Sequence, residues 1–307
     1  MKRLLILLSL FLGLLPLSAQ ETYRFAQRDT CDLYLDIWRP VPGSCTVLDS
    51  IPKPSILFVF GGGFVSGRRN DEFYRPWFKK MQEDGYTVIA IDYRLGMKGV
   101  RVGKSLPALY KSAKSFLNAQ QMGVEDVFSA VSFLTQEKDR LGIDPDNLVI
   151  CGNSAGAIIS LASVYDIAGG KTEGLPSGFA FKGVMSFAGA IVSITGEPKF
   201  KTAPCPLLLF HGTADGAVAY GHLGTVARGL WGSSRIARQM QKKGWDCCIW
   251  RYTGRTHDVA AYMYALWDIE KDFLENNVIR GIHRSMDATV EDPSLPSWGS
   301  VSLDDIY

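Results

Sequence analysis

Short apolar runs recur along the chain, and each is bounded by glycine or polar residues. A continuous apolar run of a few residues is typical of a strand that is buried on both faces. The runs that predict such strands cover residues 55–60, 87–91, 147–151, 181–187, 206–210 and 246–252. Residues 31–39 instead alternate apolar and polar side chains, which predicts an early antiparallel strand with one buried face.

Between several of these runs, apolar residues recur with helical spacing. It predicts helices over residues 124–141, 233–243 and 257–276, and a further helix after the turn at 152–156. Gly142 suits the C-cap of the first of these helices. Strands that alternate with helices predict an α/β fold, with a mostly parallel central sheet and helices on both faces. The pattern shows no large cap domain.

One domain is expected over residues 21–280, because that stretch contains no linker-like break and no internal repeat. Residues 281–307 are polar, acidic and rich in Pro and Ser. This composition predicts a loosely held C-terminal tail.

The first twenty residues predict a cleaved signal peptide. Lys2 and Arg3 precede an apolar run over residues 4–17, and small residues follow it, so we expect cleavage after Ala19 or Gln20. The run is shorter than the roughly 20 residues that span a bilayer, although an uncleaved anchor is the alternative. We therefore expect a secreted or periplasmic protein with no stable membrane anchor after cleavage.

The charges of the expected mature chain balance. The whole chain has 33 Lys and Arg against 31 Asp and Glu, and loss of Lys2 and Arg3 leaves 33 − 2 = 31 basic residues. Such a balance argues against nucleic acid as a partner. Export would permit a disulfide between Cys31 and Cys45, which flank a predicted hairpin, and free thiols are the alternative. No Cys-x-x-Cys pair or His cluster occurs, so we expect no metal and no cofactor.

The motif Gly152-Asn153-Ser154-Ala155-Gly156 lies between a predicted buried strand and a predicted helix. In this context the G-x-S-x-G pattern indicates a sharp turn that exposes a nucleophilic serine. Glycines are needed on either side because a Cβ there would collide with the strand or the helix. An ordinary glycine-rich turn is the alternative interpretation.

A serine nucleophile needs a base, and the base needs an acid to orient it. Of the four histidines, His257 follows the last predicted strand, where the base of such a site belongs. Asp215 lies in the loop that follows the predicted strand at 206–210, and it stands between Ser154 and His257 in the chain. We therefore predict Ser154, Asp215 and His257 as the catalytic residues.

A glycine run, Phe60-Gly61-Gly62-Gly63-Phe64, follows the first buried strand. The amides of Gly62 and Gly63, together with that of Ala155, are the predicted donors to an oxyanion. The run lacks the Gly-Lys-Ser/Thr and G-x-G-x-x-G spacings of nucleotide-binding loops, so nucleotide binding is not expected.

These motifs together resemble the α/β-hydrolase superfamily over roughly residues 30–278. The chain is similar to its esterase/lipase branch, which carries an HGGG-type oxyanion motif, and to small secreted bacterial esterases. The resemblance implies a Ser154–Asp215–His257 triad and an acyl-enzyme mechanism. Phe60 stands where the family usually has His. The segments best placed to cover the site are 96–123 and 216–232.

The function predicted from these features is a serine esterase that hydrolyses a small-molecule or glycan ester. Acetylated or feruloylated polysaccharides, short-chain acyl esters and xenobiotic esters are all candidate substrates. An exported serine peptidase of similar fold is one alternative, but such enzymes usually carry a Tyr after the nucleophile, where this chain has Ala155. A non-catalytic binding protein on the same fold is the other alternative.

Overall fold

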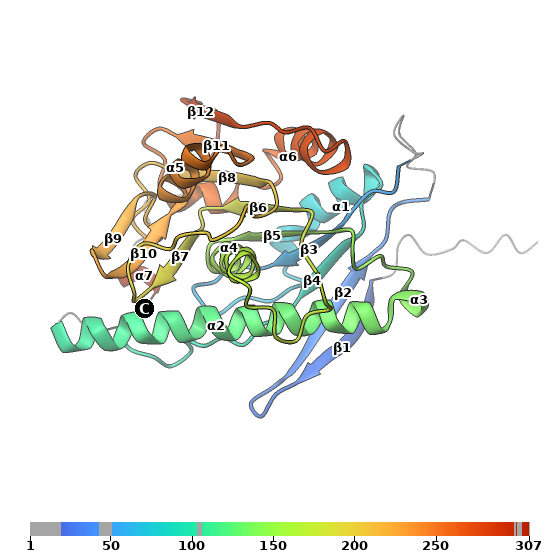
Figure 1. The fold of residues 1–307 in the computed structure, drawn as a ribbon, viewed down its shortest axis with the longest axis horizontal. Coiled ribbons are helices and arrows are strands. Elements are labelled where there is room, and N and C mark those ends of the chain that lie inside the picture. The colour runs from blue at the N-terminus through green and yellow to red at the C-terminus, as the bar shows by residue number, and fades with distance from the viewer. Residues whose placement is uncertain (1–19, 43–50, 103–105, 298, 300–302, 307) are drawn as a thin grey trace, which may run out of the picture.

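The computed structural model describes residues 20–42, 51–102, 106–297, 299 and 303–306. The predicted signal peptide, apart from Gln20, therefore lies outside the described residues. A nine-stranded sheet forms the centre of the molecule, in the order β1-β2-β4-β3-β5-β6-β8-β11-β12 (Figure 1). Its strands are β1 (Glu21–Gln27), β2 (Asp32–Trp38), β3 (Ser55–Val59), β4 (Val88–Ile91), β5 (Leu148–Asn153), β6 (Gly183–Phe187), β8 (Leu207–Gly212), β11 (Cys247–Tyr252) and β12 (Met286–Val290).

The sheet is mostly parallel, as predicted. Only the β1–β2 and β2–β4 pairs are antiparallel, and every pair from β4 to β12 is parallel. All residues of β3, β4, β5, β6 and β8 are buried, which matches their continuous apolar sequences. The polar, half-exposed edge strand β1 was not predicted from the sequence.

Helices cover both faces of the sheet. Figure 1 shows α2 and α4 on one face and α1 and α6 on the other, while α5 packs on β8 and β11. The helices are α1 (Arg75–Glu83), α2 (Leu106–Gln136), α3 (Lys138–Leu141), α4 (Ala155–Ala168), α5 (Ser233–Lys243), α6 (Trp267–Phe273) and the short α7 (Leu303–Ile306). The α/β fold and the helix over residues 233–243 are confirmed.

Two predicted helices differ from the structure. The helix expected over residues 124–141 begins at Leu106, and the short α3 takes up its last turn before Gly142 caps it at φ 59°. The closing helix expected over residues 257–276 is broken into a 3₁₀ turn (His257–Ala261), α6 and a π turn (Leu274–Ile279). The break has a tertiary cause, since Tyr262 packs edge-on against Tyr252 and donates to the Pro296 carbonyl.

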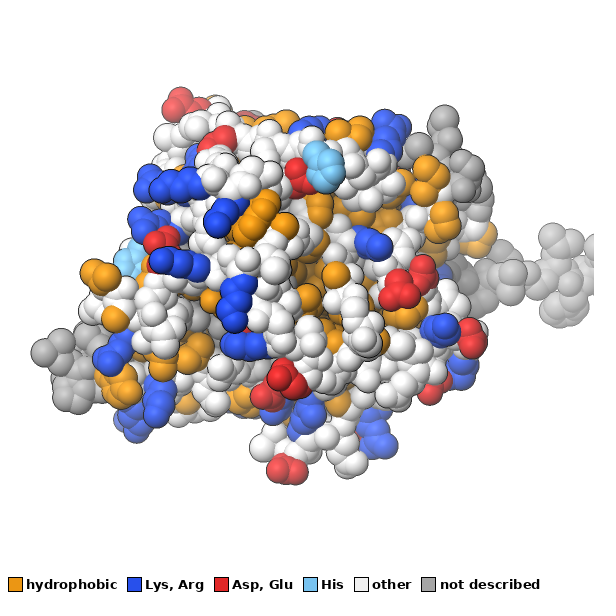
Figure 2. All heavy atoms as spheres, viewed as in Figure 1, with side chains coloured by type: hydrophobic (Ala, Val, Ile, Leu, Met, Phe, Trp, Pro, Cys, Tyr) orange, Lys and Arg blue, Asp and Glu red, His pale blue; other side chains and the backbone are white. Residues whose placement is uncertain are grey.

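A second, three-stranded antiparallel sheet was not predicted. It pairs β7 (Ala190–Ser193), β10 (Arg228–Gly232) and β9 (His222–Thr225). Glycines in these strands weaken the sequence pattern that would predict them. Gly224 and Gly229 pair across the hairpin, and a Cβ on either would lie within 2.2 Å of a backbone oxygen, so the close pairing requires glycine. Figure 2 shows hydrophobic side chains over the β9–β10 hairpin, where Leu223 and Val226 are exposed.

The expected domain end at residue 280 is wrong. Residues 286–290 form β12, which extends the sheet by pairing in parallel with β11. Because β12 is an edge strand, its sequence is polar and alternates between half-buried and exposed residues. That composition is also typical of a loosely held tail, which is why the strand was not predicted. No helix within the described part of the chain is long and apolar enough to cross a membrane.

Candidate active site

The turn between β5 and α4 holds Ser154 in a backbone conformation that side chains rarely adopt. Its φ is 51° and its ψ is −120°. A Cβ on Gly152 would lie 2.5 Å from the carbonyl of Gly156, and one on Gly156 would lie 2.0 Å from the carbonyl oxygen of Val59. The two glycines therefore allow β3, the turn and α4 to approach one another. This geometry supports the predicted sharp turn that exposes a nucleophilic serine, here called the elbow, over an ordinary turn.

The structure brings the three predicted catalytic side chains together. The Nε2 atom of His257 lies 2.8 Å from the Ser154 Oγ, and its Nδ1 atom lies 2.8 Å from Asp215 Oδ2. These residues come from the loops after β5, β8 and β11, whose carboxyl ends share one edge of the parallel sheet. The separations are those of direct hydrogen bonds, so a proton can pass from the serine to the imidazole.

Asp215 is held as a buried carboxylate. Burial alone raises the pKa of this group, but contacts with His211 and His257 outweigh that effect and lower the pKa well below its usual value. Its other oxygen, Oδ1, accepts hydrogen bonds from the amides of Ala217 and Val218, each 2.9 Å long. The ionised oxygen facing His257 accepts from Nδ1–H, which leaves Nε2 as the acceptor for the serine proton.

His211 is a further residue of this network that sequence reasoning did not assign. Its Nε2 atom lies 3.4 Å from Asp215 Oδ2, and its Nδ1 atom lies 2.8 Å from Ser233 Oγ. The imidazole is fully buried, and its Nε2 atom also lies 3.0 Å from the Val218 carbonyl oxygen, so it is held against the carboxylate. The sequence could have indicated this role, because His211 lies near the end of a buried strand and four residues before Asp215.

The glycine loop after β3 lies beside the same site. Gly62 and Gly63 line one cleft with Ser154 and His257. Gly62 has a φ of 120°, and a Cβ there would lie 2.2 Å from the carbonyl oxygen of Ser66. Ala155, the third predicted oxyanion donor, is the first residue of α4. Two of the predicted donors therefore share the cleft of Ser154, and the third follows Ser154 directly in the chain.

Asn153, the residue before the serine, joins three parts of the site, and the sequence analysis missed it. The amide of Gly61 donates to the hydroxyl of Tyr74, which donates in turn to Asn153 Oδ1. The Asn153 side-chain amide then donates to the Ala260 carbonyl, 3.0 Å away. Because all these groups are buried, the chain of hydrogen bonds ties the glycine loop and the His257 loop to the elbow.

Phe60 packs into the core where the resembled family has His. Its ring stacks on Tyr93 with centroids 4.4 Å apart, and only 2% of its surface is exposed. Gly67, at the other end of the loop, lies so close that a Cβ would be 2.7 Å from the Phe60 ring. The glycine loop is therefore held by close packing at the position where the related family has a polar His side chain.

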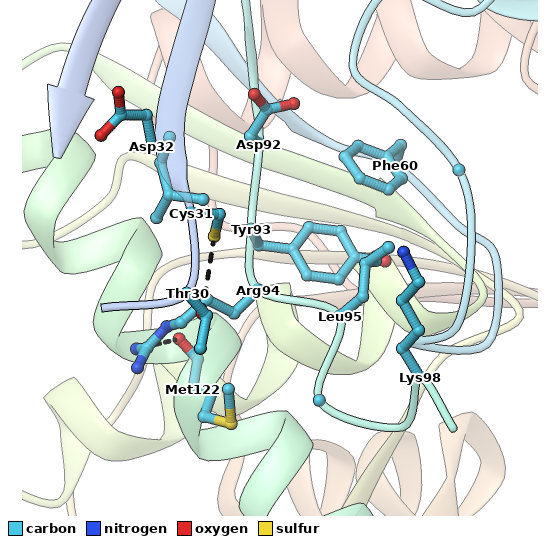
Figure 3. Close-up of a pocket in the computed structure, with 13 residues that line it drawn as sticks. Thr30, Cys31, Asp32, Phe60, Asp92, Tyr93, Arg94, Leu95, Lys98 and Met122 are labelled. Carbon is cyan, nitrogen blue, oxygen red and sulfur yellow. Dashed lines mark hydrogen bonds between the residues drawn. The ribbon is translucent and has the colours of Figure 1, made fainter. Parts of the chain in front are cut away.

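A cavity of about 590 Å³ lies at the ends of this loop and is distinct from the catalytic cleft. Figure 3 shows Phe60 and Tyr93 on one side of it and Cys31, Asp32 and Met122 on the other. Its lining contains none of the three predicted catalytic residues.

Cysteine and metal chemistry receive no support from the described residues. Cys31 is an exposed free thiol, and Cys45, its predicted partner, lies outside the described residues. In the described ranges, no three His, Cys, Asp or Glu side chains are grouped as metal ligands would be.

The catalytic cleft has a volume of about 510 Å³. Its walls include Val65, Ala260 and Ala261, and also Asp305 and Ile306 from the C-terminal segment. The described residues of 96–123 and 216–232, the segments expected to cover the site, do not line it. They contact each other instead, with the Arg228 guanidinium 4.6 Å from the centre of the Tyr110 ring.

Comparison with known proteins agrees with this fold. The BD-FAE family model, which describes an esterase family of the α/β-hydrolase type, matches residues 45–175. The structure of esterase 2 from Thermogutta terrifontis covers 83% of this chain and 94% of its own, with a TM-score of 0.55 and 22% identity. At that identity the likeness establishes the fold alone.

Curated relatives match shorter stretches. Cholinesterase 1 of Branchiostoma lanceolatum is 31% identical over 41% of this chain and 30% of its own length. Para-nitrobenzyl esterase of Bacillus subtilis (strain 168) is 26% identical over 62% of this chain and 34% of its own. This chain therefore matches only about a third of the length of these relatives. The fold is that of an α/β-hydrolase, as the sequence motifs predicted, and residues 45–175 are similar to the BD-FAE esterase family.

Proposed function

We propose that this protein is a serine hydrolase of carboxylic esters. The observation that carries the proposal is the imidazole of His257, which lies 2.8 Å from both the Ser154 hydroxyl and the Asp215 carboxylate. The similarity to cholinesterase 1, to para-nitrobenzyl esterase and to the fumonisin B1 esterase of Sphingopyxis macrogoltabida supports it.

The first half-reaction forms an acyl-enzyme. His257 Nε2 takes the proton of Ser154 as Oγ attacks the ester carbonyl carbon, and the carbonyl oxygen becomes an oxyanion. The amides of Gly62, Gly63 and Ala155 donate to this oxygen. The oxyanion then reforms the carbonyl, the bond to the alcohol oxygen breaks, and His257 gives its proton to the departing alcohol.

The second half-reaction returns the enzyme to its starting state. A water molecule loses a proton to His257 and attacks the acyl carbon. Collapse of the second oxyanion breaks the bond to Ser154 Oγ, which recovers the proton from His257 and releases the carboxylic acid. Asp215 stays ionised throughout and stabilises the imidazolium in both halves.

Hydrolysis of p-nitrophenyl acetate and butyrate tests the proposal, and butyrate is a suitable acyl group because a butyrate-bound form of the Thermogutta esterase is known. Ser154→Ala should abolish turnover and labelling by a fluorophosphonate probe. Ser66, a second serine in the same cleft, provides the control, since Ser66→Ala should keep both. An unlabelled wild-type chain that hydrolyses neither ester would contradict the proposal, as would activity confined to peptide substrates.

We also propose that the chain is exported and processed after Ala19 or Gln20, because a basic start, an apolar run and small residues follow one another there. The N-terminal sequence of protein recovered from the medium or periplasm tests this. The substrates of the exported protein would be small-molecule or glycan esters outside the cytoplasm.

A further inference from the structure

Helix α5 carries a stripe of basic side chains on its outer face. Its sequence contains four basic residues and no acidic one. Ile236 and Met240 are buried where the helix packs on β8 and β11, whereas Arg238 and Lys242, one turn apart, are exposed. Figure 2 shows several Lys and Arg side chains close together over the region where Figure 1 places α5. Positive charge is therefore concentrated on one part of a chain whose overall charge is nearly balanced.

These side chains line a groove between α5 and residues 197–200. The cavity there has a volume of about 370 Å³, and its described lining contains five Lys or Arg side chains and one carboxylate, that of Glu197. Arg235 donates to both oxygens of Glu197 at 2.8 Å, so the charge of this carboxylate is already matched. Within the described part of the chain, Arg238 and Lys242 form no salt bridge. An anion that enters the groove therefore meets an excess of positive charge.

Tertiary contacts fix the wall of the groove that faces α5. Gln239 Oε1 accepts from the amide of Phe200 at 2.7 Å, and Gln239 Nε2 donates to the Pro198 carbonyl at 2.9 Å. The buried ring of Phe200 also packs edge-on against Tyr165 of α4, with centroids 5.1 Å apart. The wall is thus joined to two helices, so the groove is formed before a ligand binds and binding does not have to order it.

A second cavity continues this groove toward the β9–β10 hairpin. It has a volume of about 630 Å³, and it shares Lys199 and Arg235, among others, with the first cavity. Its lining also includes Tyr165, Thr195 and His222, whose side chains offer neutral donors and acceptors. Neither cavity shares a described residue with the catalytic cleft. The two cavities together suit an extended molecule that carries both acidic groups and hydroxyl groups.

We propose that this groove binds an acidic polysaccharide. The carboxylate or sulfate groups of the polysaccharide pair with the basic side chains of α5, and its hydroxyl groups contact Tyr165, Thr195 and His222. Ion pairs at a protein surface are individually weak, but several of them along one polymer add up. A flat membrane fits a concave groove poorly, and the export proposed above favours a polysaccharide over nucleic acid. The inference concerns binding alone and does not depend on the reaction at Ser154.

Affinity electrophoresis in native gels tests this binding. Polygalacturonate and dextran sulfate should retard the wild-type chain at low salt, uncharged dextran should not, and about 0.2 M NaCl should weaken the retardation. The double variant Arg238→Gln, Lys242→Gln should raise the Kd for the acidic polymers by about tenfold, because it removes two of the charges that the polymer meets. Its melting temperature should match that of wild type, since both side chains are exposed.

A variant that loses the same charge elsewhere provides the control. Lys79 of α1 and Lys138 of α3 are exposed, and Figure 1 shows both helices far from α5. The double variant Lys79→Gln, Lys138→Gln should therefore leave the Kd within about twofold of the wild-type value. An equal loss of binding in the two double variants would show that net charge alone attracts the polymer, and would overturn the groove.

The remaining arms identify the anion and separate this proposal from the esterase function. Tighter binding of polygalacturonate would assign the groove to carboxylates, tighter binding of dextran sulfate would assign it to sulfates, and either result supports the proposal. Single-stranded DNA that binds as tightly as both polysaccharides would overturn it. A chain that hydrolyses esters but is retarded by neither acidic polymer would contradict the groove alone, whereas retardation without ester hydrolysis would contradict only the esterase. Ser154→Ala should bind both polymers as wild type does.

Discussion

The turn that carries Ser154 and the loop that carries His257 meet in one cleft, but different contacts hold them. The turn is made by five consecutive residues, 152–156, that include the end of β5 and the start of α4, and its two glycines allow the neighbouring backbone to approach. The His257 loop is held by groups distant in sequence, from the loop after β8 and from residues 292–299. A short local motif thus positions the nucleophile, whereas tertiary contacts position the base.

Gly212 shows how closely the His257 loop depends on its neighbours. A Cβ on this residue would lie 2.3 Å from the carbonyl oxygens of both Arg255 and Thr256. The amide of Ala214 donates to the Arg255 carbonyl, and Thr213 Oγ1 accepts from the amide of Gly254. The loops that carry the acid and the base therefore form one packed unit, and the elbow is joined to it through Asn153 and through the Ser154–His257 contact.

The largest expected effect comes from breaking the contact between acid and base. Asp215→Asn should lower kcat by about 10⁴-fold, because an amide favours the wrong tautomer of His257 and cannot stabilise the imidazolium. Thermal unfolding of the variant should show a folded chain. Single-turnover rates within tenfold of wild type would assign the acid to another group.

The elbow should be most sensitive to added volume. Gly156→Ala places a methyl group 2.0 Å from the carbonyl oxygen of Val59, which is backbone and cannot move aside, so the free energy of unfolding should fall by about 3 kcal/mol or more. Urea denaturation measures this change. Gly221→Ala is the control, since the nearest atom to its Cβ is Ser234 Oγ at 3.8 Å, and it should change stability by less than about 0.5 kcal/mol.

Asn153→Ala removes the link between the two regions. It leaves the Tyr74 hydroxyl and the Ala260 carbonyl without this buried partner, so stability should fall by about 2 kcal/mol. If the link also sets the distance between Ser154 and His257, kcat should fall while KM changes little. A variant with normal stability and kcat would show that the two regions are positioned independently.

A further expected effect depends on pH and concerns α6, which follows the His257 loop. Burial raises the pKa of Glu270 well above its ordinary value, although the indole of Trp77 donates to one of its oxygens at 3.0 Å. The folded chain thus keeps a proton that the unfolded chain releases above about pH 4.3. The contribution of this group to stability therefore decreases as pH rises from there toward the folded pKa.

Glu270→Gln removes this proton release and nearly preserves the shape of the side chain. The melting temperature of the variant relative to wild type should therefore rise steadily between pH 5 and pH 8. Parallel melting curves across that range would show that Glu270 is ionised in the folded protein.

Much of the architecture followed from local patterns. The strands at the centre of the sheet are buried on both faces, so their sequences are apolar throughout and were recognisable without tertiary information. The chemistry of the site was also local in origin, since Gly152, Ser154 and Gly156 need their residue types for steric reasons within one turn. The order of Ser154, Asp215 and His257 along the chain then indicated which acid and base to expect.

The remaining features depend on contacts between distant residues. The glycine-rich sheet of β7, β9 and β10 and the edge strand β12 carry weak sequence patterns, because pairing partners rather than their own side chains stabilise them. His211, Asn153 and Asp305 are ordinary polar residues in the sequence, and each gains its place at the site only through groups that the fold brings beside it. The sequence alone thus indicated the central sheet, the elbow and the three residues of the triad. Tertiary structure decided what braces the acid and what forms the walls of the cleft, since those contacts join segments with no shared local pattern.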